Sequence, residues 1–155
     1  MKLSAERKGS RYFRIYSQLK DLVSVTDNRI TRMATIAALL HHKMESFSWT
    51  GFYLLSDGDL VVGPYQGPLA CQVLERNRGV CWAGINKKTT LIVPDVHKFP
   101  GHIACDPKSR SEIVIPLRDK RKKIIGVLDV DSEMIGNFDE TDAVHLEKIA
   151  GLIYS

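Results

Sequence analysis

The chain has 155 residues, of which 44% are hydrophobic and 26% charged, a composition typical of a soluble globular protein. Its net charge is +4. The number of cysteines, three, is odd, which argues against a secreted disulfide framework. No two of them form a C-x-x-C pair, which argues against a zinc ribbon and a thioredoxin motif. No segment has the length and apolarity of a signal peptide or a membrane span. We therefore expect one cytoplasmic domain, residues 1–155, that does not bind membranes.

Residues 1–47 are expected to form the helical N-terminal part of this domain. Apolar residues at helical spacing predict a first helix over 11–23, and a second helix is predicted from an N-cap at Thr26 or Asp27 to about Glu45. The apolar face of the first helix is broad enough to need a partner. That partner is either the chain's own sheet or a second copy of the chain in a homodimer.

After residue 47 the hydrophobic period changes from that of helices to that of strands. Six segments rich in β-branched and aromatic residues predict strands: 48–55, 60–65, 69–74, 89–93, 112–117 and 123–131. A short helix is expected to begin near residue 80, and a last helix follows an N-cap at Asp139. This order predicts an α+β fold, a mostly antiparallel sheet of about six strands with the N- and C-terminal helices on one face. We expect a pocket on the other face, roofed by long loops.

Residues 118–123 are mostly basic and supply much of the net charge. They lie between two strand-like segments, which favours a solvated hairpin turn over a nucleic-acid patch. No aromatic residues are interleaved with these charges to stack on bases, so we expect no nucleic-acid partner.

A loop over residues 99–106 places Cys105 three residues after a histidine. Prolines and a glycine prevent regular structure there, while Ile103 and Ala104 are expected to draw the loop inward and hold the thiol in place. A thiol held in this way has an ionisation that neighbours can tune, so it is a candidate nucleophile. His102 either lowers the pKa of the thiol or satisfies a loop carbonyl, and the sequence leaves both roles open.

The last predicted strand carries two acids with a geometric consequence. With a period of two residues, Ile125, Val127, Asp129 and Asp131 share one face, so the two carboxylates project together. Glu112 begins the neighbouring strand and brings a third carboxylate to the same region. Three converging acids suggest a cationic ligand group such as an ammonium, or a shared proton to donate. The alternative is that the acids only mark the exposed end of the strand.

Two aromatic residues and the two other cysteines have both structural and functional interpretations. Trp49 and Tyr53 lie four residues apart on one strand face and form either an apolar pocket wall or part of the core. Cys71 and Cys81, each taken alone, are typical of buried core thiols. The spacing of cysteines, histidine and acids is too irregular for a metal site, so we expect neither a metal nor another cofactor.

Taken together, these motifs closely resemble the free methionine-(R)-sulfoxide reductases, small single-domain enzymes with the GAF fold. The resemblance runs from about Trp49 to the C-terminal helix and includes all three cysteines in register. The motifs that carry it are residues 63–67, 70–71, 78–81, 93–97, 100–106, 111–114 and 126–131. It implies that the chain reduces free L-methionine-(R)-sulfoxide to methionine.

The resemblance also implies roles for the cysteines. Cys105 matches the nucleophile that attacks the sulfoxide sulfur and becomes a sulfenic acid. Cys71 matches the resolving residue, which condenses with the sulfenic acid to a disulfide that thioredoxin then reduces. Cys81 matches a third family cysteine, also implicated in activity. After it the family usually has a Gly-Thr pair, whereas this chain has Trp82 and Ala83, a large indole that either packs in the core or narrows the pocket.

The remaining site residues follow from the same resemblance. Glu112, Asp129 and Asp131 resemble the carboxylates that hold the ammonium of the substrate and help to protonate the departing oxygen. Trp49 and Tyr53 correspond to aromatics around its methyl group. The alternative is a GAF-type module that senses a small ligand or redox state without turnover, but such a module needs no trio of cysteines.

Overall fold

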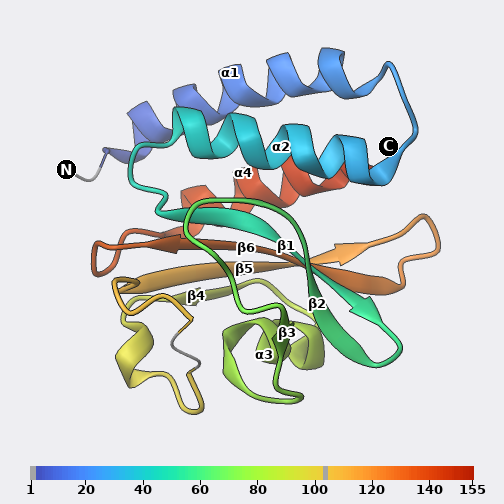
Figure 1. Ribbon diagram of the computed structural model, residues 1–155. Coiled ribbons are helices and arrows are strands. Elements are labelled where there is room, and N and C mark those ends of the chain that lie inside the picture. The colour runs from blue at the N-terminus through green and yellow to red at the C-terminus, as the bar shows by residue number, and fades with distance from the viewer. Residues whose placement is uncertain (1–2, 103–104) are drawn as a thin grey trace.

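The computed structural model describes residues 3–102 and 105–155, and its centre is one antiparallel sheet (Figure 1). The spatial order of the strands is β3-β2-β1-β6-β5-β4. Their bounds are β1 (Trp49–Ser56), β2 (Asp59–Gln66), β3 (Val73–Leu74), β4 (Leu91–Val93), β5 (Ser111–Arg118) and β6 (Ile124–Ser132). The predicted α+β fold with about six strands is confirmed.

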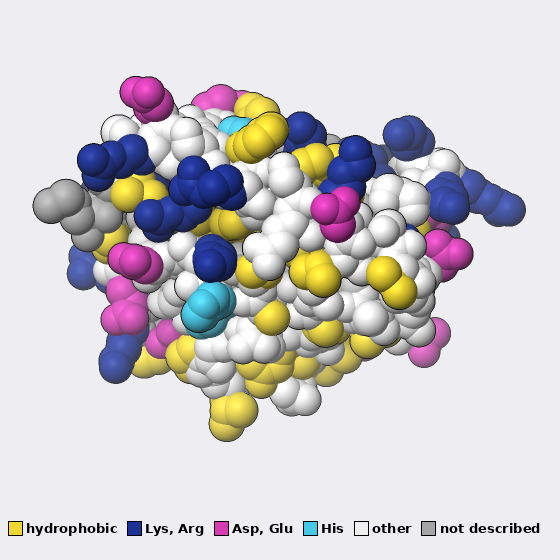
Figure 2. Space-filling view, turned by 90° about the horizontal axis from the view of Figure 1, so that it is seen from above, with side chains coloured by type: hydrophobic (Ala, Val, Ile, Leu, Met, Phe, Trp, Pro, Cys, Tyr) yellow, Lys and Arg dark blue, Asp and Glu magenta, His cyan; other side chains and the backbone are white. Residues whose placement is uncertain are grey.

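Three helices form layers on one face of this sheet: α1 (Ala5–Val23), α2 (Arg29–Lys43) and α4 (Glu140–Ala150). Figure 1 shows α2 and α4 between the sheet and α1. The last residues form a short 3-10 helix, η2 (Gly151–Tyr154). α2 thus packs on the sheet of its own chain, and α1 packs on α2 and α4. A continuous apolar core fills the space between the helices and the sheet. Figure 2 views the molecule from above, from the side of the helices, and Lys and Arg side chains are interspersed with hydrophobic ones across that surface.

The first helix begins six residues earlier than the apolar pattern predicts. Ser4 is its N-cap and accepts a hydrogen bond from the Arg7 amide at 3.3 Å. The Lys8 ammonium is buried and lies 2.6 Å from a carboxylate oxygen of Asp142, whose other oxygen accepts a hydrogen bond from the Tyr12 hydroxyl at 2.6 Å. This buried cluster joins α1 to the start of α4. It explains why the polar residues before residue 11 belong to the helix.

The N-caps of the other two helices on this face were predicted with different success. Asn28 caps α2 by accepting a hydrogen bond from the Thr31 amide at 3.0 Å, so the predicted cap at Thr26 or Asp27 is wrong by one or two residues. Asp139 caps α4, as predicted, with a reciprocal capping box.

The other face of the sheet carries α3 (Gly79–Lys87), the 3-10 helix η1 (Val96–Lys98) and the loops around them. A second apolar cluster lies between α3 and the sheet. Within the described part of the chain, no helix is long and apolar enough to cross a membrane.

The predicted strand over 69–74 is wrong for most of its length, since only its last two residues pair with β2. Leu69 is 88% exposed, and Cys71 is bonded to Cys105 in the loop at the pocket. The segment is therefore a loop in front of the sheet and not an extension of it.

A β-bulge interrupts the alternation of β6. Leu117 pairs with Gly126 and Arg118 with Ile124, so Ile125 is an extra residue without a partner in β5. Ile125 packs towards the helices, whereas Val127 belongs to the cluster on the opposite face. The prediction that Ile125 shares a face with Val127 is therefore wrong, because a bulge reverses the alternation.

Gly126, the residue next to the bulge, lies where the adjacent strand β1 comes close. A Cβ atom on Gly126 would overlap the carbonyl oxygen of Tyr53 on the adjacent strand β1. Beyond the bulge the alternation is regular, so Val127, Asp129 and Asp131 face away from the helices, as predicted. The basic hairpin is also present, and Asp119 accepts hydrogen bonds from the amides of Arg121 and Lys123 in its turn.

Candidate active site

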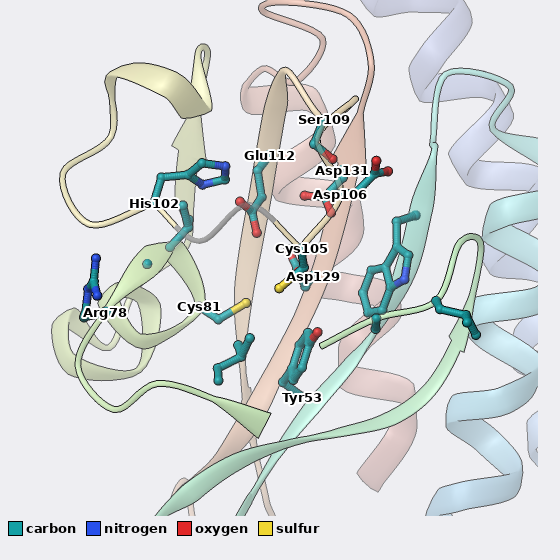
Figure 3. Close-up of a pocket in the computed structure, with 16 residues that line it drawn as sticks. Tyr53, Arg78, Cys81, His102, Cys105, Asp106, Ser109, Glu112, Asp129 and Asp131 are labelled. Carbon is teal, nitrogen blue, oxygen red and sulfur yellow. The ribbon is translucent and has the colours of Figure 1, made fainter. Parts of the chain in front are cut away.

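The pocket lies on the sheet face opposite α1, α2 and α4, between the sheet, α3 and the loops (Figure 3). Seven of the eight predicted site residues line it: Trp49, Tyr53, Cys81, Cys105, Glu112, Asp129 and Asp131. The eighth, Cys71, is attached to the pocket through its bond to Cys105. The structure thus brings together side chains from β1, α3, β5, β6 and two loops.

A disulfide joins Cys71 and Cys105, which lie 34 residues apart in the chain. Their Cα atoms are 5.7 Å apart, a separation usual for a disulfide. Both residues are half-buried at the edge of the pocket. The pairing agrees with the one that the family resemblance implies. Ile103 and Ala104, which were expected to hold Cys105 in place, lie outside the described residues.

The three acids converge because β5 and β6 pair in a fixed register. Glu112 lies opposite Asp131, and the next acid along β6, Asp129, lies opposite Val114. Glu112 is 7% exposed and Asp129 is 5% exposed, so the interpretation that the acids mark an exposed strand end is wrong for these two. Asp131 is partly exposed.

Burial and mutual repulsion determine where protons sit in this acid cluster. Burial raises the pKa of Glu112, and the charges of Asp129 and Asp131 raise it further. Burial also raises the pKa of Asp129, but hydrogen bonds from Glu112 and Cys81 oppose that rise. The arrangement therefore favours a protonated Glu112 that donates a hydrogen bond to an ionised Asp129.

Cys81 is a buried free thiol next to these acids. Burial raises its pKa, and the charge of Asp129 followed by that of Glu112 raises it further. It therefore stays a neutral thiol that donates to Asp129, and it is a poor nucleophile in this state. Its neighbour Trp82 is 7% exposed and packs in the second apolar cluster instead of lining the pocket. Of the two alternatives for the indole, packing in the core is confirmed.

Stacked aromatic rings form one wall of the pocket. The ring of Trp49 lies 5.7 Å from that of Tyr53 and 5.2 Å from that of Tyr65, with interplanar angles of 22° and 19°. Polar atoms of the same rings hold the loop that carries Cys71. The indole of Trp49 donates a hydrogen bond to the Pro68 carbonyl at 3.1 Å, and the Tyr53 hydroxyl donates to the Cys71 carbonyl at 3.1 Å.

His102 lines the pocket beside Cys105, with its ring edge-on to that of His97 at 6.1 Å. Burial lowers the pKa of His102, and the nearby His97 lowers it further. A ring that is neutral near pH 7 contributes no positive charge to a thiolate. This electrostatic environment weakens the interpretation of His102 as the activator of Cys105.

Sequence reasoning missed three polar residues of the pocket: Arg78, Asp106 and Ser109. Arg78 forms an ion pair with Glu75 at 2.9 Å, and the charge of Asp106 raises the pKa of Asp131. Ser109 is buried although it belongs to a loop. Arg78 and Asp106 are within the recognised motifs, so the motifs did contain a signal, whereas no periodicity marks Ser109.

The pocket combines a disulfide-bonded cysteine pair, an acid whose raised pKa favours its protonated form, and an apolar wall. One oxygen of Asp129, Oδ1, is buried and has no hydrogen-bond partner among the described residues. An unpaired buried acceptor is costly, so it is suited to a ligand that brings a donor. The site can therefore bind a small cationic molecule, supply a proton to it and exchange two electrons with it.

Comparisons with known proteins support this chemistry. The GAF domain family matches residues 31–154. GAF domain-containing protein A of Dictyostelium discoideum is 44% identical over 154 residues, covering 99% of this chain and 96% of that protein. The free methionine-R-sulfoxide reductase of Escherichia coli is 44% identical over 120 residues, covering 77% of this chain and 72% of that enzyme. The structure of the free methionine-R-sulfoxide reductase of Neisseria meningitidis in complex with its substrate has a TM-score of 0.90 and 40% identity, covering 94% of this chain and 87% of that one.

Proposed function

The chain belongs to the GAF-domain family of free methionine-(R)-sulfoxide reductases, and on this premise we propose that it reduces free L-methionine-(R)-sulfoxide to methionine. The observation that carries the proposal is the disulfide between Cys71 and Cys105 at the edge of a pocket of buried acids. Two thiols that become a disulfide supply the two electrons of the reduction, and a buried acid supplies a proton. This chemistry needs no cofactor.

In the first step the thiolate of Cys105 attacks the sulfur of the sulfoxide. The oxygen of a sulfoxide leaves poorly unless it is protonated, and Glu112 holds a proton because burial raises its pKa. The attack forms a bond between the two sulfur atoms. The protonated oxygen then passes from the substrate's sulfur to the sulfur of Cys105, and the bond between the two sulfur atoms breaks with its electron pair on the substrate's sulfur. Methionine leaves, and Cys105 remains as a sulfenic acid.

In the second step the thiol of Cys71 attacks the sulfenic acid. The new S–S bond forms as water leaves, which gives the disulfide of this structure. A dithiol reductant then returns both residues to thiols and becomes a disulfide itself. We assign this role to thioredoxin, and both half-buried cysteines lie at the pocket edge, where such a partner can reach them.

The ammonium of a free amino acid suits the unpaired oxygen of Asp129, with Asp131 beside it. The methyl group then lies against the apolar wall of Trp49 and Tyr53. A methionine sulfoxide within a peptide has no ammonium next to it and leaves the buried acids unpaired. This difference selects the free amino acid.

The decisive experiment incubates the reduced protein with each epimer of free methionine sulfoxide and dithiothreitol and measures the methionine formed. We expect turnover of the R epimer and little or none of the S epimer. A peptide with an internal methionine sulfoxide is the matched control for recognition of the ammonium. If neither free epimer is reduced, the protein acts instead as a sensor module without turnover.

A further inference from the structure

Cys81, Glu112 and Asp129 place one sulfur and two carboxyl groups around a common point of the pocket (Figure 3). Their potential ligand atoms all lie within 4.8 Å of one another, and all three residues are buried. We propose that this cluster binds a soft divalent cation such as Zn²⁺ or Cd²⁺ and that the bound ion inhibits the enzyme. The ion is an inhibitor that competes for the pocket and not a cofactor of the reaction.

The donor set suits such an ion. Thiolate and carboxylate groups are both common zinc ligands, and a tetrahedral site has ligand atoms about 3.5 Å apart. Separations within 4.8 Å exceed this spacing by at most about 1.3 Å, so the site needs only a small approach of the three side chains. The thiol of Cys81 and the carboxyl of Glu112 release their protons to solvent when the ion binds.

A second observation indicates a cationic ligand at this point. Asp129 is 5% exposed, and its Oδ1 atom has no hydrogen-bond partner in the part of the chain that the structure describes. Asp131 adds a third carboxylate nearby, and no lysine or arginine of the described residues forms an ion pair with any of the three acids. An ion held by Cys81 and the acids would satisfy the unpaired oxygen and neutralise the crowded charges.

Inhibition follows because the ion and the substrate need the same groups. The ammonium of the substrate is assigned to Asp129, and the proton for its oxygen to Glu112. A metal ion on these two carboxylates excludes both. This part of the inference rests on the proposed function, whereas binding of the ion does not.

The disulfide form allows a direct test of binding, because Cys81 is then the single free thiol of a chain with three cysteines. Titration with Cd²⁺ should produce the ultraviolet sulfur-to-cadmium charge-transfer band and saturate at one ion per chain. Cys81→Ser should abolish the band. Glu112→Gln and Asp129→Asn should each weaken binding by about tenfold or more. Asp106→Asn is the matched control, because it removes a pocket carboxylate outside the cluster, and it should leave the affinity within about twofold.

Two outcomes would overturn the metal site. One is the absence of the band in the disulfide form of the unaltered protein. The other is a band whose affinity is unchanged by both carboxylate variants, which would mean that a lone thiol captures the ion. Circular dichroism of each variant establishes that it is folded, and the result with the unaltered protein does not depend on any variant.

Inhibition is tested by initial rates of methionine formation with a phosphine reductant, because dithiothreitol itself binds these metals. Zn²⁺ should raise the KM for methionine sulfoxide several-fold with little change in kcat, and a chelator should restore the original KM. An unchanged KM at a Zn²⁺ concentration that saturates the site would refute competition. If the protein forms no methionine at all, the proposed function fails, but the Cd²⁺ titration still tests the site.

Discussion

The hydroxyl of Tyr53 donates a 3.1 Å hydrogen bond to the carbonyl oxygen of Cys71, the residue whose sulfur is bonded to Cys105. An aromatic residue of the substrate wall therefore also holds the backbone of the resolving cysteine. Trp49 fixes the same loop through the Pro68 carbonyl. Under the proposed function, binding of the substrate's methyl group and resolution of the sulfenic acid are therefore linked through the loop that these two aromatic residues hold.

Tyr53→Phe should separate these two roles, because it removes the hydroxyl and keeps the ring. Loss of a neutral hydrogen bond of about 1 kcal/mol predicts that the disulfide forms about fivefold more slowly. Rapid-quench measurement should show an unchanged first release of methionine, followed by slower appearance of the disulfide. Tyr65→Phe is the control, since this ring also stacks on Trp49 but its hydroxyl forms no hydrogen bond to the loop among the described residues. An equal slowing of both steps would contradict the assignment.

The two bonded cysteines should differ in what their loss does. Cys105→Ser removes the nucleophile and should abolish methionine formation. Cys71→Ser keeps the nucleophile and should release about one methionine per chain before a sulfenic acid accumulates, when a dithiol that requires a disulfide substrate is the reductant. Quantification of methionine per chain and trapping of the sulfenic acid with dimedone check both results. Multiple turnovers of Cys105→Ser would reverse the assignment.

Most of the sheet and the pocket could be predicted because local patterns determine them. Alternation with a period of two places Asp129 and Asp131 on one face of β6, and it places Trp49 and Tyr53 on one face of β1. The cap at Asp139 needs only its own turn of helix. These features depend on neighbours within a few residues, which a single sequence displays.

The errors arise where distant contacts override local pattern. The helix start at Ala5 depends on Lys8, whose partner Asp142 lies 134 residues away. The bulge at Ile125 appears only in the register between β5 and β6, and next to it Gly126 leaves room for the backbone of Tyr53 on β1. The loop at Cys71 is held by a disulfide, and periodicity carries no information about that bond.

The buried cluster at Lys8 makes a specific prediction for stability. Lys8→Met leaves the carboxylate of Asp142 buried without its cation and should lower the free energy of unfolding by about 3 to 5 kcal/mol. Urea denaturation at pH 7 measures this change. Lys20→Met alters an exposed lysine of the same helix and should change stability by less than about 0.5 kcal/mol. Equal effects of the two variants would show that the ion pair does not secure α1.

Gly51 makes the aromatic wall possible. A Cβ atom at this position would lie 2.7 Å from the Trp49 ring and 2.9 Å from the Tyr65 Cα atom, closer than atoms can pack. Gly51→Ala should therefore displace the wall, lower the free energy of unfolding by about 1 to 3 kcal/mol and raise the KM for methionine sulfoxide. At Gly151 a Cβ atom would meet nothing within 4 Å, and Gly151→Ala should leave both quantities nearly unchanged.

Glu112 should make the stability of the disulfide form depend on pH in a defined direction. Its pKa is raised by burial and by the charges of Asp129 and Asp131, so the folded protein keeps a proton that the unfolded chain loses above about pH 4.3. Because the folded state then binds more protons, the free energy of unfolding falls as the pH rises through this range and on towards the folded pKa.

Glu112→Gln cannot release this proton, so the free energy of unfolding of this variant should fall less steeply with pH. Urea denaturation at a series of pH values measures both slopes. The exposed Glu45→Gln variant should retain the slope of the unaltered protein. Identical slopes for Glu112→Gln and Glu45→Gln would show that Glu112 is ionised in the fold and is not the proton donor.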